Sequence, residues 1–317
     1  MNIDMDLPLT ICRALADPTR LRILALLRAM ELSVGELAQV LVQSQPRISR
    51  HIKILAEAGL IGRRKEGAWV FLGLGDDALV RPLLAALDAW AAQGPPDPWT
   101  VADQARLSAV QADRARAAEA YFNAHAGSWD EMRSLYVAES DVEAAITALL
   151  ADVPIGRFVD IGTGTGRMLE LFAPQAVSAT GIDRSPEMLR LARAKLAAKG
   201  LEHVELRQGD MYGLTLPDGA ADTVLLHQVL HYAQLPEAAL AEAARLLAPG
   251  GRLLVVDFAP HEREELRSRH AHARLGFSDE QMAHWFAAAG LTTDAVRALE
   301  GGELTVKLWL GRKPATA

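Results

Sequence analysis

Apolar residues recur at the spacing of an amphipathic helix near the start of the chain, and each run begins with a helix-capping residue. Asp17 precedes a proline, which is typical of an N-cap followed by the first helical position. Ser33 and Glu36 have the spacing of a capping box, in which each side chain accepts a hydrogen bond from the other's backbone. Ser44 begins a third run that Gly59 ends. The pattern therefore predicts three short capped helices in succession.

A hairpin and a further helix are predicted after these three helices. Residues 63–71 have the pattern of two short strands, with a turn at Glu66 and Gly67. Residues 76–92 are rich in Ala and Leu, with one apolar stripe that comprises Leu79, Leu83, Leu87 and Trp90. The proline-rich segment 94–98 cannot continue a helix and marks a boundary.

The hydrophobic rhythm changes beyond Pro154. Residues 100–150 have a helical pattern with a break near Gly127, whereas the rest alternates short β-rich runs with helical ones. The β-rich runs are residues 158–161, 179–183, 204–207, 223–226, 253–257 and 304–310. This alternation predicts a parallel, doubly wound α/β sheet for the second part of the chain.

Composition and charge separate the two parts further. The chain has a formal net charge of −7, yet residues 1–75 hold ten Lys or Arg and seven Asp or Glu, so they carry +3 and the remainder −10. The single cysteine, Cys12, excludes an intrachain disulfide and fits a reducing cytoplasm. We expect no signal peptide, because the first ten residues lack a basic stretch, and no membrane span, because no apolar run is long enough.

The third predicted helix and the hairpin carry the basic residues of the first part. Six basic residues and one acid lie within residues 44–65, and this local cluster is typical of a phosphate-binding surface. We expect Ile48, Ile52 and Leu55 to hold the helix to the core, while its polar face reads base edges and contacts phosphates. The predicted DNA-binding residues are Ser44, Gln45, Arg47, Ser49, Arg50, His51 and Lys53 on the helix, with Arg63, Arg64 and Lys65 on a hairpin wing.

Three segments of this first part resemble a known family of regulators. LADPTRLRILALL, LSVGELAQVLVQSQPRISRHIKILAEAGLI and RRKEGAWVFLGL are similar to the arsenic-repressor (ArsR/SmtB) family of dimeric winged-helix proteins over about residues 9–92. The resemblance implies operator DNA as a partner. It also implies a homodimer that pairs the helix from Asp76 to Ala92 with the N-terminal helix.

The metal-sensing members of that family place a Cys-x-Cys where this chain has Ser33 and Gly35. Other members use Asp and His on the dimer helix, and residues 76–92 contain no His. Soft metals need thiolate or imidazole ligands. We therefore predict that no metal bound in this part of the chain is the inducer.

The second part contains a candidate nucleoside site. Asp160 lies near the end of the first β-rich run. A loop with three alternate glycines follows this run and lets the backbone turn sharply and a ligand approach closely. The loop residues are Gly162, Thr163, Gly164 and Gly166. Asp183 ends the second run, where its carboxylate can accept from ribose hydroxyls, and Asp210 follows the third, where it can accept from an adenine amino group.

These segments, with LLAPGGRLLVVDF at residues 246–258, resemble class I S-adenosylmethionine-dependent methyltransferases over about residues 120–312. The resemblance implies a Rossmann-like fold with S-adenosylmethionine or S-adenosylhomocysteine as cofactor or ligand. It places Arg184 beside the adenine, Met211 with Asp210 on the adenine edge, and Asp160 and His227 near the amino-acid end. The segment YFNAHAGSWDEMRSLY, residues 121–136, resembles a helical lid, in which Arg133 either pairs the ligand carboxylate or is a surface residue.

No residue is assigned a catalytic role. His227 and His231 lie where a methyl acceptor would bind, and either is a candidate general base or a packing residue. We predict no metal site, because neither this histidine pair nor His270 with His272 has a third ligand at obvious spacing.

The sequence thus predicts a winged helix-turn-helix domain over residues 1–93, a linker and connecting helix over 94–120, and a methyltransferase-like domain over 121–317. The combination is similar to the S-adenosylhomocysteine-responsive repressors of the methionine cycle. A DNA-binding regulator whose second domain senses the nucleoside is one interpretation. A small-molecule methyltransferase with a DNA-binding head is the alternative. A third is an enzyme whose winged helix serves only to dimerise, although the complete reading helix and wing count against it.

Overall fold

The computed structural model describes residues 6–66, 69–93, 97–125, 138–300 and 303–315. The chain forms two compact units, Met1–Arg116 and Ala117–Ala317, and each unit has its own core. Among the described residues, no helix combines the length and the hydropathy that crossing a bilayer requires.

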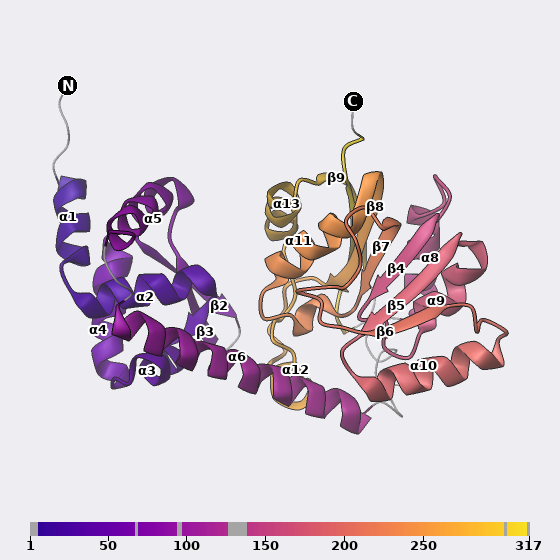
Figure 1. The fold of residues 1–317 in the computed structure, drawn as a ribbon, viewed down its shortest axis with the longest axis horizontal. Coiled ribbons are helices and arrows are strands. Elements are labelled where there is room, and N and C mark those ends of the chain that lie inside the picture. Colours follow the sequence, from indigo (N-terminus) through magenta and orange to yellow (C-terminus); the bar gives the residue numbers. More distant parts are fainter. Residues whose placement is uncertain (1–5, 67–68, 94–96, 126–137, 301–302, 316–317) are drawn as a thin grey trace. The chain divides into compact units, whose positions relative to one another are not determined.

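The first unit places helices around a small antiparallel sheet (Figure 1). Its helices are α1 (Asp6–Leu15), α2 (Pro18–Ala29), α3 (Val34–Leu41), α4 (Gln45–Glu57), α5 (Asp77–Ala91) and the first half of α6 (Pro98–His125). Its strands are β1 (Leu32–Ser33), β2 (Ile61–Glu66) and β3 (Trp69–Leu74), in the order β1-β3-β2. The chain thus contains the predicted helix-turn-helix in α3 and α4, followed by the predicted hairpin.

The helix caps explain why these helices begin where they do. The Asp17 carboxylate accepts from the backbone N–H of Thr19 at 2.8 Å and of Arg20 at 3.2 Å. Ser33 and Glu36 form the predicted capping box, with Glu36 accepting from the backbone N–H of Ser33 at 2.8 Å. Ser44 occupies the N-cap of α4, but its side chain makes no capping hydrogen bond, so that part of the prediction is wrong. A proline in the first turn of α4 supplies pre-organised backbone instead.

The second unit is a seven-stranded sheet covered by helices on both faces (Figure 1). The strands lie in the order β6-β5-β4-β7-β8-β10-β9. Their bounds are β4 (Arg157–Ile161), β5 (Ser178–Asp183), β6 (Glu205–Gln208), β7 (Ala221–His227), β8 (Leu247–Phe258), β9 (Thr292–Leu299) and β10 (Val306–Arg312). The helices are α8 (Glu139–Leu149), α9 (Arg167–Phe172), α10 (Pro186–Ala198), α11 (Pro236–Leu246), α12 (Glu264–His270) and α13 (Asp279–Ala288).

The first five strands are parallel, as predicted, but β10 is antiparallel to both β8 and β9. The expectation of a wholly parallel sheet was therefore wrong at this edge. It also missed β9, because Thr292–Leu299 is a mostly exposed strand whose sequence lacks a continuous apolar run.

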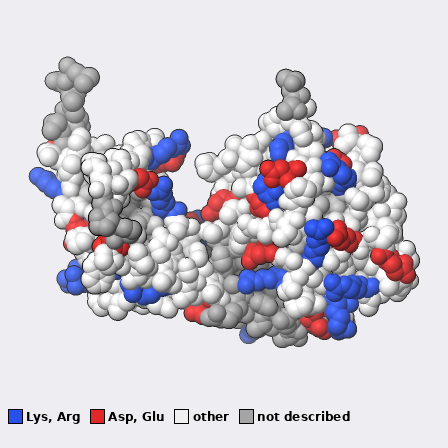
Figure 2. Space-filling model, viewed as in Figure 1, with Lys and Arg blue, Asp and Glu red and all other residues white. Residues whose placement is uncertain are grey.

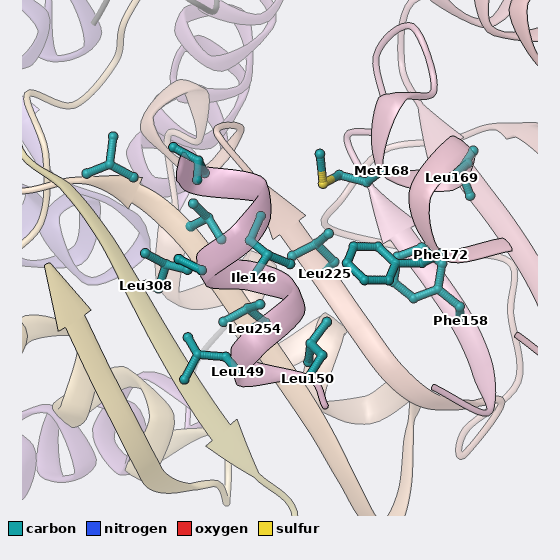
Figure 3. Close-up of a cluster of buried hydrophobic side chains, with 14 of the residues drawn as sticks. Ile146, Leu149, Leu150, Phe158, Met168, Leu169, Phe172, Leu225, Leu254 and Leu308 are labelled. Carbon is teal, nitrogen blue, oxygen red and sulfur yellow. The ribbon is translucent and has the colours of Figure 1, made fainter. Parts of the chain in front are cut away.

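Alternate residues of the central strands form two separate cores. Leu225 and Leu254 point to the side covered by α8 and α9, where they pack with Phe158, Phe172 and Ile146 (Figure 3). Their chain neighbours belong to the opposite core, which includes Val224, Leu226, Leu253, Val255 and residues of α11 and α13. This period of two follows from the pleat of a strand. Because β4 pairs in parallel with both β5 and β7, the carboxyl ends of these three strands lie at one edge of the sheet, where open α/β sheets bind ligands.

Candidate functional site

Helix α4 has an apolar face that holds it to the first unit and a polar face that is exposed. Ile48, Ile52 and Leu55 are buried, as predicted. The exposed residues are Ser44, Gln45, Arg47, Ser49, Arg50 and Lys53. Among the described residues neither Arg47 nor Arg50 has an ion-pair partner, and the ammonium of Lys53 lies 3.8 Å from Glu57. Long cationic side chains on one accessible helix face suit contact with phosphates and base edges.

His51 is the exception on this helix. Its Nδ1 lies 3.7 Å from the Asp17 carboxylate, which caps α2, and its side chain is only 12% exposed. Burial lowers the pKa of His51 below its ordinary value, so the ring is mostly neutral at neutral pH. The structure thus places His51 against the cap of α2 instead of on the outer face with Arg47 and Arg50.

The three basic residues predicted for the wing differ in their exposure on the hairpin. Strands β2 and β3 pair antiparallel, with Arg63 opposite Leu72 and Lys65 opposite Val70. Arg63 and Lys65 are exposed. Arg64 is half-buried, donates to the Glu31 carboxylate at 2.8 Å and lies over the Phe71 ring at 5.1 Å. Arg64 therefore ties the hairpin to the body of the unit.

The glycine loop follows β4 and is fixed by backbone hydrogen bonds to β5. The N–H groups of Gly162 and Thr163 donate to the Ile182 carbonyl at 2.7 and 3.0 Å. Gly162, Gly164 and Gly166 all have left-handed φ angles, of 74°, 54° and 86°. A Cβ on Gly162 would lie 2.3 Å from Val229, so the loop also needs a glycine there for space.

Asp160 supports this loop from inside the fold. It is buried, and its Oδ2 accepts from the Thr163 hydroxyl at 2.6 Å. Two of the predicted ligand-binding residues are therefore hydrogen-bonded to each other. This contact fixes the start of the loop.

Asp183 ends β5 beside the loop. Its Oδ2 accepts from the Gly164 N–H at 2.9 Å and its Oδ1 from the Ser185 N–H at 2.8 Å. Burial raises the pKa of the Asp183 carboxyl, and the backbone donors only partly oppose that effect. The Arg184 N–H is a third backbone donor to this carboxylate. Because a carboxylate offers about four acceptor positions, one is left for a ribose hydroxyl.

The turn after β6 brings Asp210 and Arg184 close. Asp210 is exposed, with one oxygen 3.8 Å from the Arg184 guanidinium and the other accepting from the Tyr212 N–H at 3.2 Å. Met211 is half-buried and packs on the core of the α11 side. The predicted adenine-edge residues therefore lie together at the sheet edge.

Tyr212 is a site residue that sequence reasoning missed. Its hydroxyl oxygen accepts from the N–H groups of Gln234 at 2.7 Å and Leu235 at 3.2 Å. Burial raises the pKa of this phenol. Tyr212 thus joins the turn that carries Asp210 to the loop that follows β7.

Two histidines lie at the end of β7. His227 is the last residue of the strand and is nearly buried. His231 is buried too, with its Nδ1 2.8 Å from Asp257 and its ring stacked on His272 at 4.1 Å between centroids. Burial keeps the pKa of His272 well below its ordinary value. His231 thus lies in a buried network, a setting that suits a packing role better than that of an accessible base.

Arg133 lies outside the described residues, as do residues 126–136 of the segment predicted as a lid. Among the residues that are described, no three His, Cys, Asp or Glu side chains gather so that they could hold a metal ion.

Gly181 is a second residue that the sequence analysis missed. A Cβ at this position would lie 2.5 Å from Leu169, which packs α9 against β5 behind the loop. A glycine within a β-rich run was the available signal.

Comparison with known proteins gives each unit a counterpart. Residues 17–62 match the family of bacterial regulatory proteins named arsR, and residues 159–255 match a methyltransferase domain. The arsenical resistance operon repressor of Escherichia coli is 39% identical over 111 residues, which are 35% of this chain and 86% of that protein. Demethylmenaquinone methyltransferase of Thermus thermophilus is 42% identical over 106 residues, 33% of this chain and 48% of the enzyme.

The chain thus spans about half the length of this methyltransferase relative. Among solved structures, a methyltransferase from Bacillus halodurans superimposes with a TM-score of 0.50 at 20% identity. The match covers 55% of this chain and 99% of that one. At this identity the likeness concerns the fold of the second unit.

Proposed function

Because this chain belongs to the bacterial arsR family of regulatory proteins and also carries a methyltransferase domain, we propose that it is a nucleoside-sensing repressor. One observation carries the proposal: a single chain holds both an accessible basic helix and a glycine loop flanked by the carboxylate of Asp183. The histidines that would serve a methyl acceptor are nearly buried. The ligand is S-adenosylhomocysteine or S-adenosylmethionine, and the protein acts in the cytoplasm on operator DNA.

In this proposal α4 enters the major groove. Arg47 and Arg50 contact guanine edges or phosphates, and Gln45 reads adenine, because these side chains have the donor geometry that those groups require. Arg63 and Lys65 contact flanking phosphates from the hairpin. The operator is an inverted repeat with half-sites about one helical turn apart.

A homodimer supplies the second reading helix. Helix α5 buries only Val80 within its own chain, although one side of it is lined with leucines. On α1, Leu7 and Leu9 are 52% and 43% exposed, and Trp90 near the end of α5 is 65% exposed. Apolar surface of this extent on two helices favours burial against a second copy of the chain.

The ligand is held by the loop from Gly162 to Gly166, by Asp183 on the ribose and by Asp210 on the adenine edge. Asp160 and His227 support its amino-acid end. S-adenosylmethionine would supply an electrophilic methyl group to an acceptor, whereas S-adenosylhomocysteine lacks that group. Metals are not the signal in this proposal, because Ser33 is engaged in a helix cap and Gly35 has no ligand atom.

S-adenosylhomocysteine is the proposed signal, and it lowers operator affinity. The two ligands differ by one methyl group and one positive charge on sulfur. A site that closes over the neutral thioether resists the bulkier sulfonium through steric contact and desolvation.

The test is a titration of operator DNA against the free protein and against the protein saturated with each ligand. We expect S-adenosylhomocysteine to weaken operator binding by about 5- to 150-fold, the range of typical allosteric coupling. By reciprocity, operator DNA must weaken S-adenosylhomocysteine binding by the same factor. Equal operator affinity in all three states would contradict the sensor proposal.

A second candidate function is an active small-molecule methyltransferase with a DNA-binding head. The similarity of the second unit to demethylmenaquinone methyltransferase favours it. Turnover of S-adenosylmethionine with a small acceptor, together with ligand-independent operator binding, would support this candidate over the sensor.

A further inference from the structure

Helix α6 is continuous across the boundary between the two units. It runs from Pro98 to His125, whereas the units meet between Arg116 and Ala117. Its first half packs on the helix-turn-helix unit, where Leu107 and Val110 are buried. The chain therefore leaves the first unit as a helix that is anchored there.

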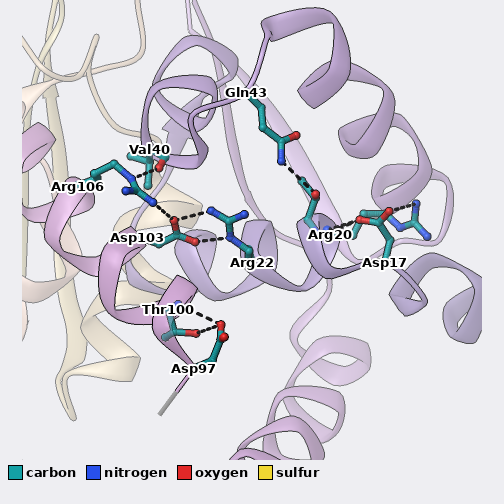
Figure 4. Close-up of polar contacts among 10 residues, drawn as sticks. Asp17, Arg20, Arg22, Val40, Gln43, Asp97, Thr100, Asp103 and Arg106 are labelled. Atoms are coloured by element: carbon teal, nitrogen blue, oxygen red, sulfur yellow. Dashed lines mark hydrogen bonds and ion pairs between the residues drawn. The ribbon is translucent and has the colours of Figure 1, made fainter.

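A charge network around one buried carboxylate makes this anchor. The Asp103 carboxylate is 3% exposed and accepts from Arg22 of α2 at 2.6 and 2.7 Å (Figure 4). The fork-like pairing of guanidinium and carboxylate fixes the orientation of both side chains. Trp99, at the start of α6, lies over the Arg22 guanidinium at 4.9 Å. These contacts hold the first turns of α6 against α2.

Arg106 extends the network to the helix that precedes the reading helix. It donates to Asp103 at 2.7 Å and to the Val40 carbonyl at 2.5 Å (Figure 4). Val40 lies in the last turn of α3, where carbonyl groups have no partner within the helix. The turn to α4 begins at Val42, two residues further on. Arg106 thus joins α6 to the end of α3, next to the helix-turn-helix turn.

The contact between α2 and α5 is of a different kind. Arg28 pairs with Asp88 of α5 at 2.7 Å, but these side chains are 52% and 56% exposed. Exposed pairs couple two helices only weakly. The contacts around the buried Asp103 carboxylate therefore hold α6 to α2 more firmly than this exposed pair holds α5.

We propose that α6 transmits ligand occupancy from the second unit to the reading head, with Arg106 as the positioning residue that acts on the turn between α3 and α4. This inference rests on the proposed sensor function and names the route of its regulation. A shift of α6 changes the support of the Val40 carbonyl, and with it the angle at which α4 leaves the turn.

The experiment uses the full chain with Arg106→Gln, which removes the guanidinium contacts and leaves the pairing of Arg22 with Asp103. The matched control is Arg28→Gln, which breaks the exposed pair with Asp88. Operator affinity is measured with and without S-adenosylhomocysteine, and ligand affinity is measured separately by calorimetry. We expect the control to keep the wild-type coupling factor. Arg106→Gln should reduce that factor to about twofold or less, with each separate affinity within about threefold of wild type.

Hydrogen exchange gives a second readout. In the wild type, the ligand should change the exchange of the amides of residues 36–44, and in Arg106→Gln this change should disappear. Unaltered coupling in Arg106→Gln would overturn the inference. Loss of operator binding without ligand would also overturn it, because Arg106 would then be a structural support only. Absence of coupling in the wild type would instead refute the sensor proposal itself.

Discussion

The exposed face of α4 and the glycine loop after β4 hold their functional groups in opposite ways. Arg47 and Arg50 extend from a regular helix into solvent and have no ion-pair partner among the described residues. Asp183 accepts from three backbone N–H groups, with those of Ser185 and Gly164 at 2.8 and 2.9 Å, beside a loop with three left-handed glycines. Flexible cations suit a long polyanion, whereas a small ligand needs groups whose positions are fixed before it binds.

The surface of the second unit strengthens this contrast. On its face in Figure 2, basic and acidic side chains lie next to one another. Arg190 pairs with Glu187 and Arg245 with Glu242, each at 2.7 Å. Paired charges of this kind offer a polyanion little net attraction. The arginines of α4 without an ion-pair partner among the described residues, Arg47 and Arg50, belong to the first unit.

The largest expected effect tests the fixed backbone of the loop. Gly162→Ala adds a Cβ within 2.3 Å of Val229 and requires an alanine at a φ of 74°. Overpacking and left-handed strain together should lower the free energy of unfolding by about 3 kcal/mol. Unfolding of the variant and the wild type in denaturant measures this difference in free energy. Gly200→Ala is the control, because its φ is 71° but the space around it is open. It should cost only the backbone strain of about 1–2 kcal/mol, and equal losses in the two variants would contradict the packing argument.

The next effect concerns the carboxylate beside the loop. Asp183→Ala should weaken nucleoside binding by about 1.5–3 kcal/mol, which is roughly 10- to 150-fold, because the ribose loses a charged acceptor. Calorimetric titration with S-adenosylhomocysteine measures this loss of affinity. Because burial raises the pKa of Asp183, the wild-type affinity should decline as the pH falls, beginning above the ordinary range of an aspartate. The same protonation removes a buried charge, so this group's contribution to stability rises as the pH falls. Wild-type affinity in the variant would mean that the loop binds another ligand.

A smaller effect tests the accessible cations. Replacement of both Arg50 and Lys53 by Ala should weaken operator binding and reduce the slope of log affinity against log salt by about 0.9 for each lost phosphate contact. The matched control replaces Arg193 and Lys199, which are exposed on the second unit, and should leave the slope unchanged. An unchanged slope in the first variant would remove α4 from the interface.

The smallest effect lies at the turn before α4. Val42 is 72% exposed and has a φ of 54°, a conformation that a β-branched residue adopts at a cost. Val42→Gly should raise the free energy of unfolding by about 0.5 kcal/mol, after the larger chain entropy of glycine is subtracted. Val177→Gly is the control, since Val177 is 84% exposed and has no positive φ. Thermal unfolding measures the stability of both variants. A higher stability in both, or in neither, would argue against strain at Val42.

Local patterns in the sequence were sufficient for most of the fold. The Asp17 cap and the capping box at Ser33 depend on residues close together in the chain, and the alternation of β-rich and helical runs was enough to predict the parallel strands. The direction of β10 and the existence of β9 were not predictable in this way, because β10 is buried like the parallel strands and β9 is a mostly exposed edge strand with a weak hydrophobic signal. The sequence pattern therefore failed at the edge of the sheet and succeeded at its centre.

The candidate sites show the same limit. The glycine loop and Asp183 were predictable, since each directly follows a recognisable strand. The contacts of Arg64 with Glu31 and of His51 with Asp17 join residues more than thirty positions apart, and no local pattern distinguishes them from solvent-facing neighbours. Charge alone therefore does not show which basic residues lie against carboxylates of the same unit.

The anchor of α6 also affects how the chain acquires its structure during synthesis. Arg22 finds its carboxylate partner 81 residues later, at Asp103. Until residues 98–110 have left the ribosome, the Arg22 guanidinium lacks the Asp103 carboxylate as an acceptor. The apolar surface that Leu107 covers in the folded unit is then still exposed. The nascent helix-turn-helix should therefore complete its folding only when the first turns of α6 emerge. A ribosome pause placed before residue 98 should leave this unit sensitive to protease, and a pause well beyond residue 113 should protect it.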